Sequence, residues 1–145
     1  MSTLPNHLRR AATVLALAAL LGACSHGPHH PGGHDVTLTG AQEVPANTST
    51  ASGHSDIRVA HDRSVSGGVR YTGMVAIVAH IHEAPVGANG PVIVPLVKTS
   101  GDMFVVPAGA MLTPSQYASY QAGNLYVNVH SAAYPAGEIR AQLKP

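Results

Sequence analysis

Residues 125–143 read LYVNVHSAAYPAGEIRAQL and contain two largely apolar segments joined by a turn. Apolar and polar side chains alternate over 125–130, which is the pattern of a half-buried β-strand. A second segment, 138–143, follows the turn-forming residues YPAG at 134–137. The two segments therefore predict an antiparallel pair of strands that closes the chain.

Shorter segments upstream of this pair also favour strands. The long apolar run at 74–82 predicts a central strand. Pro91 and Pro95 restrict the Val/Ile-rich segment between them to an edge or a bulged position, since proline cannot donate to a ladder. Upstream of the closing pair we expect strands over 35–41, 55–60, 65–72, 74–82, 91–98 and 101–106.

The sequence predicts one helix. Thr113 followed by Pro114 is typical of an N-cap and the first helical position, and Gly123 supplies a stop signal. We therefore expect a single short helix near residues 114–122. One small helix among many short strands indicates an all-β fold, either a β-sandwich or a barrel.

Composition narrows the class of protein. The 145 residues carry a formal net charge of +1, and only 10% of them are charged. This balance gives no broad positive surface, so a nucleic-acid partner is not expected. The single cysteine excludes a disulfide framework within the chain. The length fits one domain.

The N-terminal segment predicts export from the cytoplasm. Residues 1–23 combine a basic pair with an apolar run too short to span a bilayer, as a signal peptide does. The sequence LGAC at 21–24 resembles the lipobox of bacterial lipoproteins, in which Cys24 is acylated, with palmitate among its lipids, and becomes the first mature residue. An ordinary secretory signal or an uncleaved anchor is the alternative. Ser25 resembles the sorting pattern for the outer membrane, so we expect a lipid-anchored protein of the bacterial cell envelope that faces the periplasm.

Residues 24–34 predict a tether between the lipidated cysteine and the domain at 35–145. The sequence SHGPHHPGGH contains only small residues, proline, glycine and histidine, so it cannot bury an apolar face. Its histidines could collect metal ions weakly, or their presence could be incidental.

Three histidines on predicted strands form the candidate metal site. His80 and His82 are two apart, so in a strand they share one face. His130 lies on the penultimate strand, on the same face as Asn128. Three imidazoles suit copper or zinc, and copper fits an oxidising compartment better. A histidine on a sheet face can instead be a satisfied hydrogen-bonding residue.

Scarce carboxylates and their neighbours supply further candidates. Glu43 and Glu138 could be metal ligands or could fix the tautomer of an imidazole. Asn128 and Arg140 are candidates for the same supporting positions. The alternative is a structural ion pair between one of the two carboxylates and Arg140.

Five motifs together resemble the CHRD domain, which occurs as repeats in chordin and singly in many bacterial secreted proteins. The resemblance covers residues 36–143 and departs from the usual pattern only slightly, for example at Ser131 and Ala141. It implies an all-β, immunoglobulin-like sandwich or barrel and says little about activity. The motifs are GAQEVP at 40–45, HIHEAP at 80–85, GANGP at 87–91, LYVNVHS at 125–131 and YPAGEIR at 134–140.

Three functions remain open from the sequence. The leading expectation is a membrane-tethered, metal-binding domain without catalytic residues, its protein partner unknown. The second is an interaction or structural module in which the same residues stabilise the fold. The third is a copper-dependent activity, because the HIHE strand also looks like the ligand strands of copper–zinc superoxide dismutases. That enzyme family has a cysteine pair and a histidine-rich zinc loop, which this chain lacks, and a fourth imidazole would have to come from His54 or His61.

Overall fold

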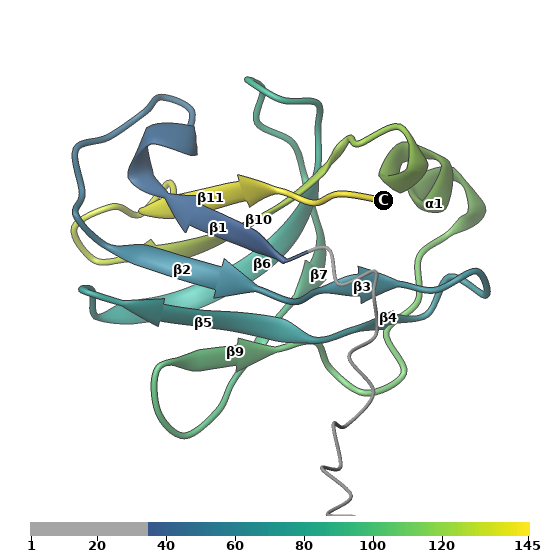
Figure 1. The fold of residues 1–145 in the computed structure, drawn as a ribbon, viewed down its shortest axis with the longest axis horizontal. Helices are drawn as coiled ribbons and strands as arrows, with labels where there is room; N and C mark the ends of the chain where they lie inside the picture. The colour runs from purple at the N-terminus through teal and green to yellow at the C-terminus, as the bar shows by residue number, and fades with distance from the viewer. Residues whose placement is uncertain (1–34) are drawn as a thin grey trace, which may run out of the picture.

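The computed structural model describes residues 35–145, which form a strongly curved β-sheet with one short helix beside it (Figure 1). The predicted signal peptide, Cys24 and the tether lie outside these described residues. The elements in chain order are β1 (Val36–Thr39), the 3₁₀ helix η1 (Gly40–Gln42), β2 (Ser52–Ser55), β3 (Arg58–Val59), β4 (Val65–Ser66), β5 (Gly68–Thr72), β6 (Ala76–Glu83), β7 (Val92–Pro95), β8 (Val97–Lys98), β9 (Met103–Val105), α1 (Pro114–Gln121), β10 (Leu125–Ser131) and β11 (Ile139–Gln142).

The described strands form a nine-stranded antiparallel sheet in the order β7-β6-β10-β11-β1-β2-β5-β9-β8. β10 and β11 are the predicted closing pair, with Val129 opposite Ile139. β6 lies between β7 and β10, as expected for the long apolar run. β3 and β4 form a small separate ribbon. The prediction of an all-β fold with one short helix is confirmed.

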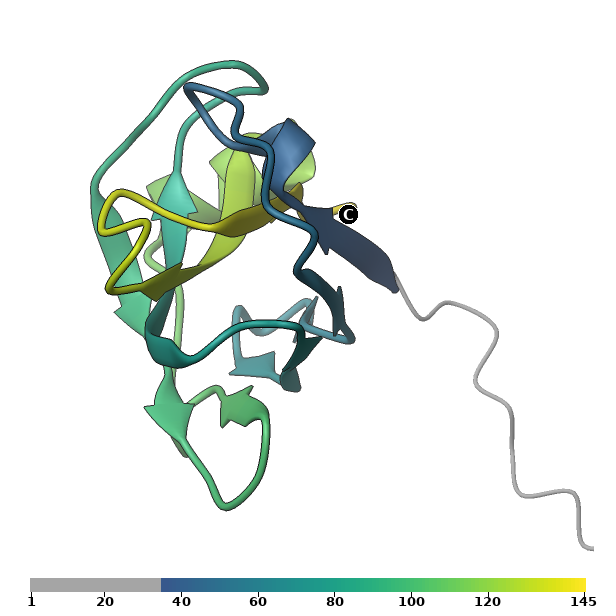
Figure 2. The ribbon, with the colours of Figure 1, turned by 90° about the vertical axis from the view of Figure 1, so that its left-hand side faces the viewer.

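The two ends of the sheet are brought together by one short segment of chain. β7 and β8 lie at opposite ends of the strand order, yet only Leu96 separates them in sequence. The Leu96 amide donates to the Ala79 carbonyl of β6 at 2.9 Å, and β8 pairs with β9. The sheet is therefore nearly closed into a barrel, and Figure 2 shows the strands wrapping around a common centre. Pro91 and Pro95 flank or end an edge strand, as their lack of a donor predicts.

Apolar side chains that alternate along the strands fill the centre of the barrel. Leu38, Val69, Val127 and Ile139 are all fully buried there. Each such side chain contributes roughly 1.5–3 kcal/mol by leaving water. Phe104 on β9 is also buried and packs against this core. The interior is thus an apolar core, and the polar side chains of the same strands point outward.

The helix follows the local signals in the sequence. Thr113 accepts a hydrogen bond from the Gln116 amide at 3.2 Å, and the Gln116 side chain accepts one from the Thr113 amide at 2.8 Å. This capping box satisfies two amides that the first turn would leave unpaired. Tyr120 packs into the core and donates to the Lys144 carbonyl at 2.9 Å, which fastens the end of the chain to the helix. Within residues 35–145 no helix is long and apolar enough to cross a membrane.

The expected strand at 55–60 is wrong in its extent. The structure has β2 before it and the short β3 within it. β2 contains glycine and histidine, which are poor strand formers, but it pairs along its whole length with β1, from Val36–Ser55 to Thr39–Ser52. Pairing with a neighbour overrides propensity at this position.

Candidate metal centre

Strands β6 and β10 direct their polar side chains away from the core. Ile81 and Val127 point into the barrel and are fully buried. Because side chains alternate along a strand, His80, His82 and His130 share the opposite face. β6 and β10 are adjacent and antiparallel, so two imidazoles from one strand meet the third from the other. The predicted histidines are therefore brought together.

The three rings lie at distances suited to one metal ion. Their ligating nitrogens all lie within 4.8 Å of one another, and they form the one such group of three in the described part of the chain. His80 Nδ1 and His130 Nε2 are 3.2 Å apart. Two nitrogens bound tetrahedrally to one zinc ion, each at about 2.0–2.1 Å, are separated by roughly 3.3–3.4 Å. Without a metal these two atoms form a hydrogen bond, and their spacing is already close to that of two ligands of one ion.

Backbone carbonyls orient two of the three rings. His82 Nδ1 lies 3.0 Å from the carbonyl oxygen of Gly90, and His130 Nδ1 lies 3.0 Å from that of Pro135. A carbonyl oxygen only accepts, so both Nδ1 atoms carry the proton and both Nε2 atoms present a lone pair. A partner on the second ring nitrogen is the usual way in which a protein orients a metal-binding histidine.

Burial keeps the three imidazoles neutral. It lowers the pKa of His80, His82 and His130 below the ordinary value of 6.5. Repulsion between the neighbouring rings lowers the pKa of His80 and His130 further, while the carbonyls partly offset the effect at His82 and His130. At neutral pH the rings can therefore act as ligands without first losing a proton.

The Tyr126 ring packs against the rings and charges of the site. The Tyr126 and His82 rings are stacked, with centroids 4.7 Å apart and an interplanar angle of 4°. The Arg140 guanidinium lies over the same tyrosine ring, 3.4 Å from its centroid. Because β6 and β11 flank β10, His82 and Arg140 press against Tyr126 from its two sides. Arg140 also donates to Asn89 Oδ1 at 3.0 Å and to the Ala88 carbonyl at 2.8 Å, which fastens the 84–91 loop over the site.

Gly90 is the point where this loop meets the strand. A Cβ added there would collide with the carbonyl of Glu83, so only glycine fits. We expect Gly90→Ala to displace the loop and to destabilise the protein by about 1–3 kcal/mol. Metal affinity is expected to fall roughly tenfold, since the carbonyl that orients His82 moves. Thermal unfolding and metal titration measure the two effects.

Gly87 offers the matched control in the same loop. A Cβ at Gly87 would meet open space, so Gly87→Ala should cost only the strain of its positive φ of 79°, about 1–2 kcal/mol. Metal affinity should remain that of the wild type. Equal losses of affinity in Gly87→Ala and Gly90→Ala would contradict the role assigned to the Gly90 carbonyl.

Glu43 and Asn128 form a buried polar pair behind the histidines. Asn128 is 2% exposed and lies directly opposite His80 in the ladder. Its amide lies beside both the His82 ring and the Glu43 carboxyl group. Burial raises the pKa of Glu43 to about 7, although the Arg140 charge and the Asn128 amide partly oppose the shift. The Arg140 charge acts on Glu43 through space, while the guanidinium donates its hydrogen bonds to the loop.

Glu43→Gln is expected to make stability less dependent on pH. The folded protein holds a proton on Glu43 up to about pH 7, whereas the unfolded chain releases it near the ordinary pKa of 4.5. Wild-type stability therefore falls as pH rises through this window, by on the order of 1–2 kcal/mol after allowance for solvent screening. The free energy of unfolding of the variant, relative to that of the wild type, should increase from pH 4.5 to pH 7 and stay constant above pH 7. Chemical denaturation with a chelator present measures both free energies of unfolding. A value for the variant that falls relative to the wild type as pH rises would refute the prediction.

The other sequence candidates lie further from the three rings. The Glu138 carboxylate accepts a hydrogen bond from Ser49 Oγ at 2.6 Å. Glu83 points away from the site and accepts from Ser119 of α1 at 2.6 Å, as its place beside His82 predicts. His61 lies near the Tyr117 hydroxyl. Glu138 thus braces a loop, and its carboxylate is not brought into the histidine group.

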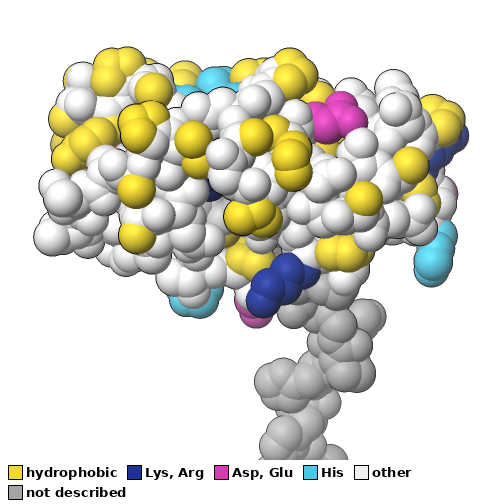
Figure 3. All heavy atoms as spheres, turned by 90° about the horizontal axis from the view of Figure 1, so that it is seen from above, with side chains coloured by type: hydrophobic (Ala, Val, Ile, Leu, Met, Phe, Trp, Pro, Cys, Tyr) yellow, Lys and Arg dark blue, Asp and Glu magenta, His cyan; other side chains and the backbone are white. Residues whose placement is uncertain are grey.

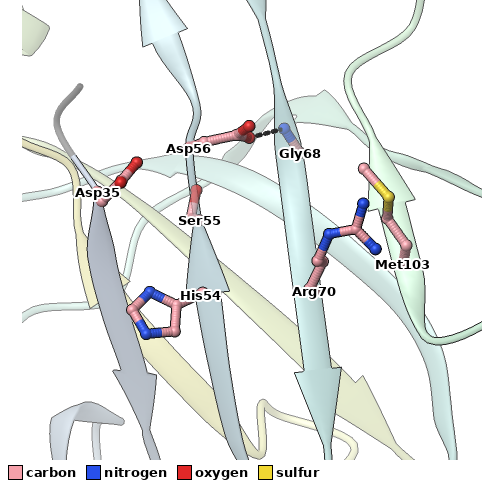
Figure 4. Close-up of a pocket in the computed structure, with 7 residues that line it drawn as sticks. All are labelled: Asp35, His54, Ser55, Asp56, Gly68, Arg70 and Met103. Atoms are coloured by element: carbon pink, nitrogen blue, oxygen red, sulfur yellow. Dashed lines mark hydrogen bonds between the residues drawn. The ribbon is translucent and has the colours of Figure 1, made fainter. Parts of the chain in front are cut away.

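His54 belongs to a different surface. It lines a pocket of about 270 Å³ on strands β2, β5 and β9, where Asp56 accepts a hydrogen bond from the Gly68 amide at 2.8 Å (Figure 4). Within residues 35–145, neither His54 nor His61 joins the histidine group, so neither supplies the fourth imidazole of a dismutase-like site.

Three groups that hold the site were not predicted from the sequence: the Tyr126 ring and the carbonyls of Gly90 and Pro135. Alternation along 125–130 already places Tyr126 on the face of Asn128 and His130. The carbonyls carry no side-chain signal, although both lie within the glycine- and proline-rich loops between the strands. Few charged side chains are visible on the face of the molecule in Figure 3, in keeping with the low charge of the sequence.

The sequence matches the CHRD domain family over residues 35–143. No curated protein and no solved structure matches it. The family match spans the barrel, the three histidines and the loops that orient them, and the chain belongs to the CHRD domain family.

Proposed function

We propose that this protein binds one transition-metal ion through His80, His82 and His130. The observation that carries the proposal is the convergence of three ligand nitrogens to within 4.8 Å of one another. The backbone carbonyls that fix two of the rings and the lowered pKa values of all three support it. Copper is favoured over zinc, because imidazole sites bind divalent copper more tightly.

The proposed setting is the bacterial cell envelope. Lipidation of Cys24 would anchor the chain, and Ser25 resembles the sorting pattern of proteins held at the outer membrane facing the periplasm. The support is the signal-like segment before Cys24 and the position of the chain's single cysteine at its end. More than one acyl chain on that cysteine would give stable attachment.

Metal titration of the full chain tests the proposal. The histidines before residue 35 could bind metal nonspecifically, so the background chain carries H7S, H26S, H29S, H30S and H34S. We expect one Cu(II) or Zn(II) ion per chain, with copper bound more tightly. The melting temperature should rise on loading and return to the apo value with a chelator, because the ion binds the folded state. A stoichiometry that stays unchanged in a His80→Ala/His82→Ala variant would reject the proposal.

An interaction module is the second candidate. Val75, Ile77 and Val78 are exposed, and a hollow of about 590 Å³ lies beside the first two. Neighbouring exposed apolar side chains beside a hollow are a feature of protein interaction surfaces. This function predicts that His80→Ala lowers thermal stability equally with and without a chelator, whereas metal binding predicts a chelator-dependent loss.

A further inference from the structure

Buried polar atoms without hydrogen-bond partners gather beside the three histidines. Among the described residues these atoms are His82 Nε2, Asn128 Oδ1 and Glu43 Oε1. The Asn128 side chain lies between the other two groups. A buried polar atom without a partner costs on the order of 1–3 kcal/mol, so three in one place call for a missing ligand.

The chemistry of these atoms indicates what the ligand is. His82 Nε2 presents a lone pair, because the proton of that ring is on Nδ1 and is donated to Gly90. The Asn128 amide nitrogen is directed to the Glu43 carboxyl group, which leaves its carbonyl oxygen Oδ1 on the side of His82. His82 Nε2 and Asn128 Oδ1 are therefore two buried acceptors without partners on neighbouring side chains. A positive ion between them satisfies both.

The position of Asn128 in the sheet brings it to the same point as the other two rings. It lies directly opposite His80 and two residues before His130 on the same face. Its side chain is 2% exposed and that of His82 is 7% exposed, so both project into the covered part of the site. The half-buried His80 and His130 complete the group.

We propose that Asn128 Oδ1 is the fourth ligand of the metal and that the site is closed to external ligands. The proposal rests on the proposed three-histidine site and names the atom that completes it. Glu43 acts as a positioning residue, because it receives the Asn128 amide and turns Oδ1 toward the ion. Closed four-ligand sites are typical of structural or storage roles, whereas catalytic sites keep an open position.

Azide titration of the Co(II)-loaded chain, in the background that lacks the histidines before residue 35, tests this proposal. Azide binds where cobalt has an open or water-filled position and adds a new absorption band. We expect the four-coordinate spectrum of the wild type to remain unchanged by azide. Asn128→Ala opens the position, so azide should bind that variant at least roughly tenfold more tightly.

A second variant distinguishes loss of the oxygen ligand from loss of the folded structure. Asn128→Asp/Glu43→Gln restores an oxygen ligand, and the new glutamine can donate to it as the asparagine does to Glu43. This variant should bind cobalt and remain insensitive to azide.

Azide binding to the wild type as tight as to Asn128→Ala, or no azide binding by either chain, would overturn the fourth-ligand assignment. Both results leave three-histidine binding intact. Failure of the wild type to take up one Co(II) ion per chain would instead overturn the metal site itself.

Discussion

Replacing His82 with alanine is expected to lower Cu(II) or Zn(II) affinity by at least about 100-fold, or roughly 2.7 kcal/mol. His82 is the most buried of the three rings, and its Nε2 has no hydrogen-bond partner among the described residues. Tyr126 on its face and the Gly90 carbonyl at its edge hold it in place, so little entropy is lost on binding. Competition with a chelator of known affinity, in the chain without its first five histidines, measures the change.

His54→Ala is the matched control for this prediction. His54 lies on the separate surface of β2 and is exposed. Its removal should leave both affinity and stoichiometry as in the wild type. Equal losses in His54→Ala and His82→Ala would mean that the chain binds metal through scattered surface histidines.

Arg140→Ala is expected to destabilise the fold by about 3–5 kcal/mol, the largest single-residue effect on stability that we predict. Arg140 is 1% exposed, and its side chain joins β11 to the 84–91 loop through Asn89 and the Ala88 carbonyl. Its removal leaves a cavity at a buried position, takes both hydrogen bonds from the loop and strips the guanidinium from Tyr126. Urea denaturation with a chelator present measures the loss without any contribution from metal.

Arg140→Lys separates charge from shape. Lysine keeps the positive charge but cannot form the planar stack or reach both acceptors in the same way. We expect it to recover less than half of the stability lost in Arg140→Ala. A loss below about 1 kcal/mol in the alanine variant would show that the loop is held by other contacts.

The strands predicted from the sequence are those whose side chains alternate clearly. The closing pair, the central run at 74–82 and the helix at 114–122 follow from periodicity, turn residues and capping signals. β2 could not be found in this way, since Gly53 and His54 disfavour a strand on their own. The closure of the barrel was also hidden, because it depends on one segment, 92–98, pairing with both edges of the sheet.

For the site, alternation predicted that His80 and His82 share one face, and the pairing of β6 with β10 in the structure brings His130 to them. Periodicity predicts on which face of the sheet a side chain lies. Side chains on the same face of two adjacent strands are then neighbours. The roles of Glu43 and Glu138 could not be separated from the sequence, since each lies in a short motif near the site. The structure buries Glu43 beside Asn128 and pairs Glu138 with Ser49. The choice of nitrogen on each ring depends on backbone carbonyls, which sequence patterns do not reveal.

Anomalous diffraction at the metal absorption edge, from crystals of the loaded full chain, would locate the ion and its ligands. We predict one strong peak at about 2.0–2.1 Å from His80 Nδ1, His82 Nε2 and His130 Nε2. The Gly90 and Pro135 carbonyls should keep their hydrogen bonds to the two oriented rings. A peak elsewhere, or none while His80 Nδ1 remains hydrogen-bonded to His130 Nε2, would contradict the three-histidine metal site.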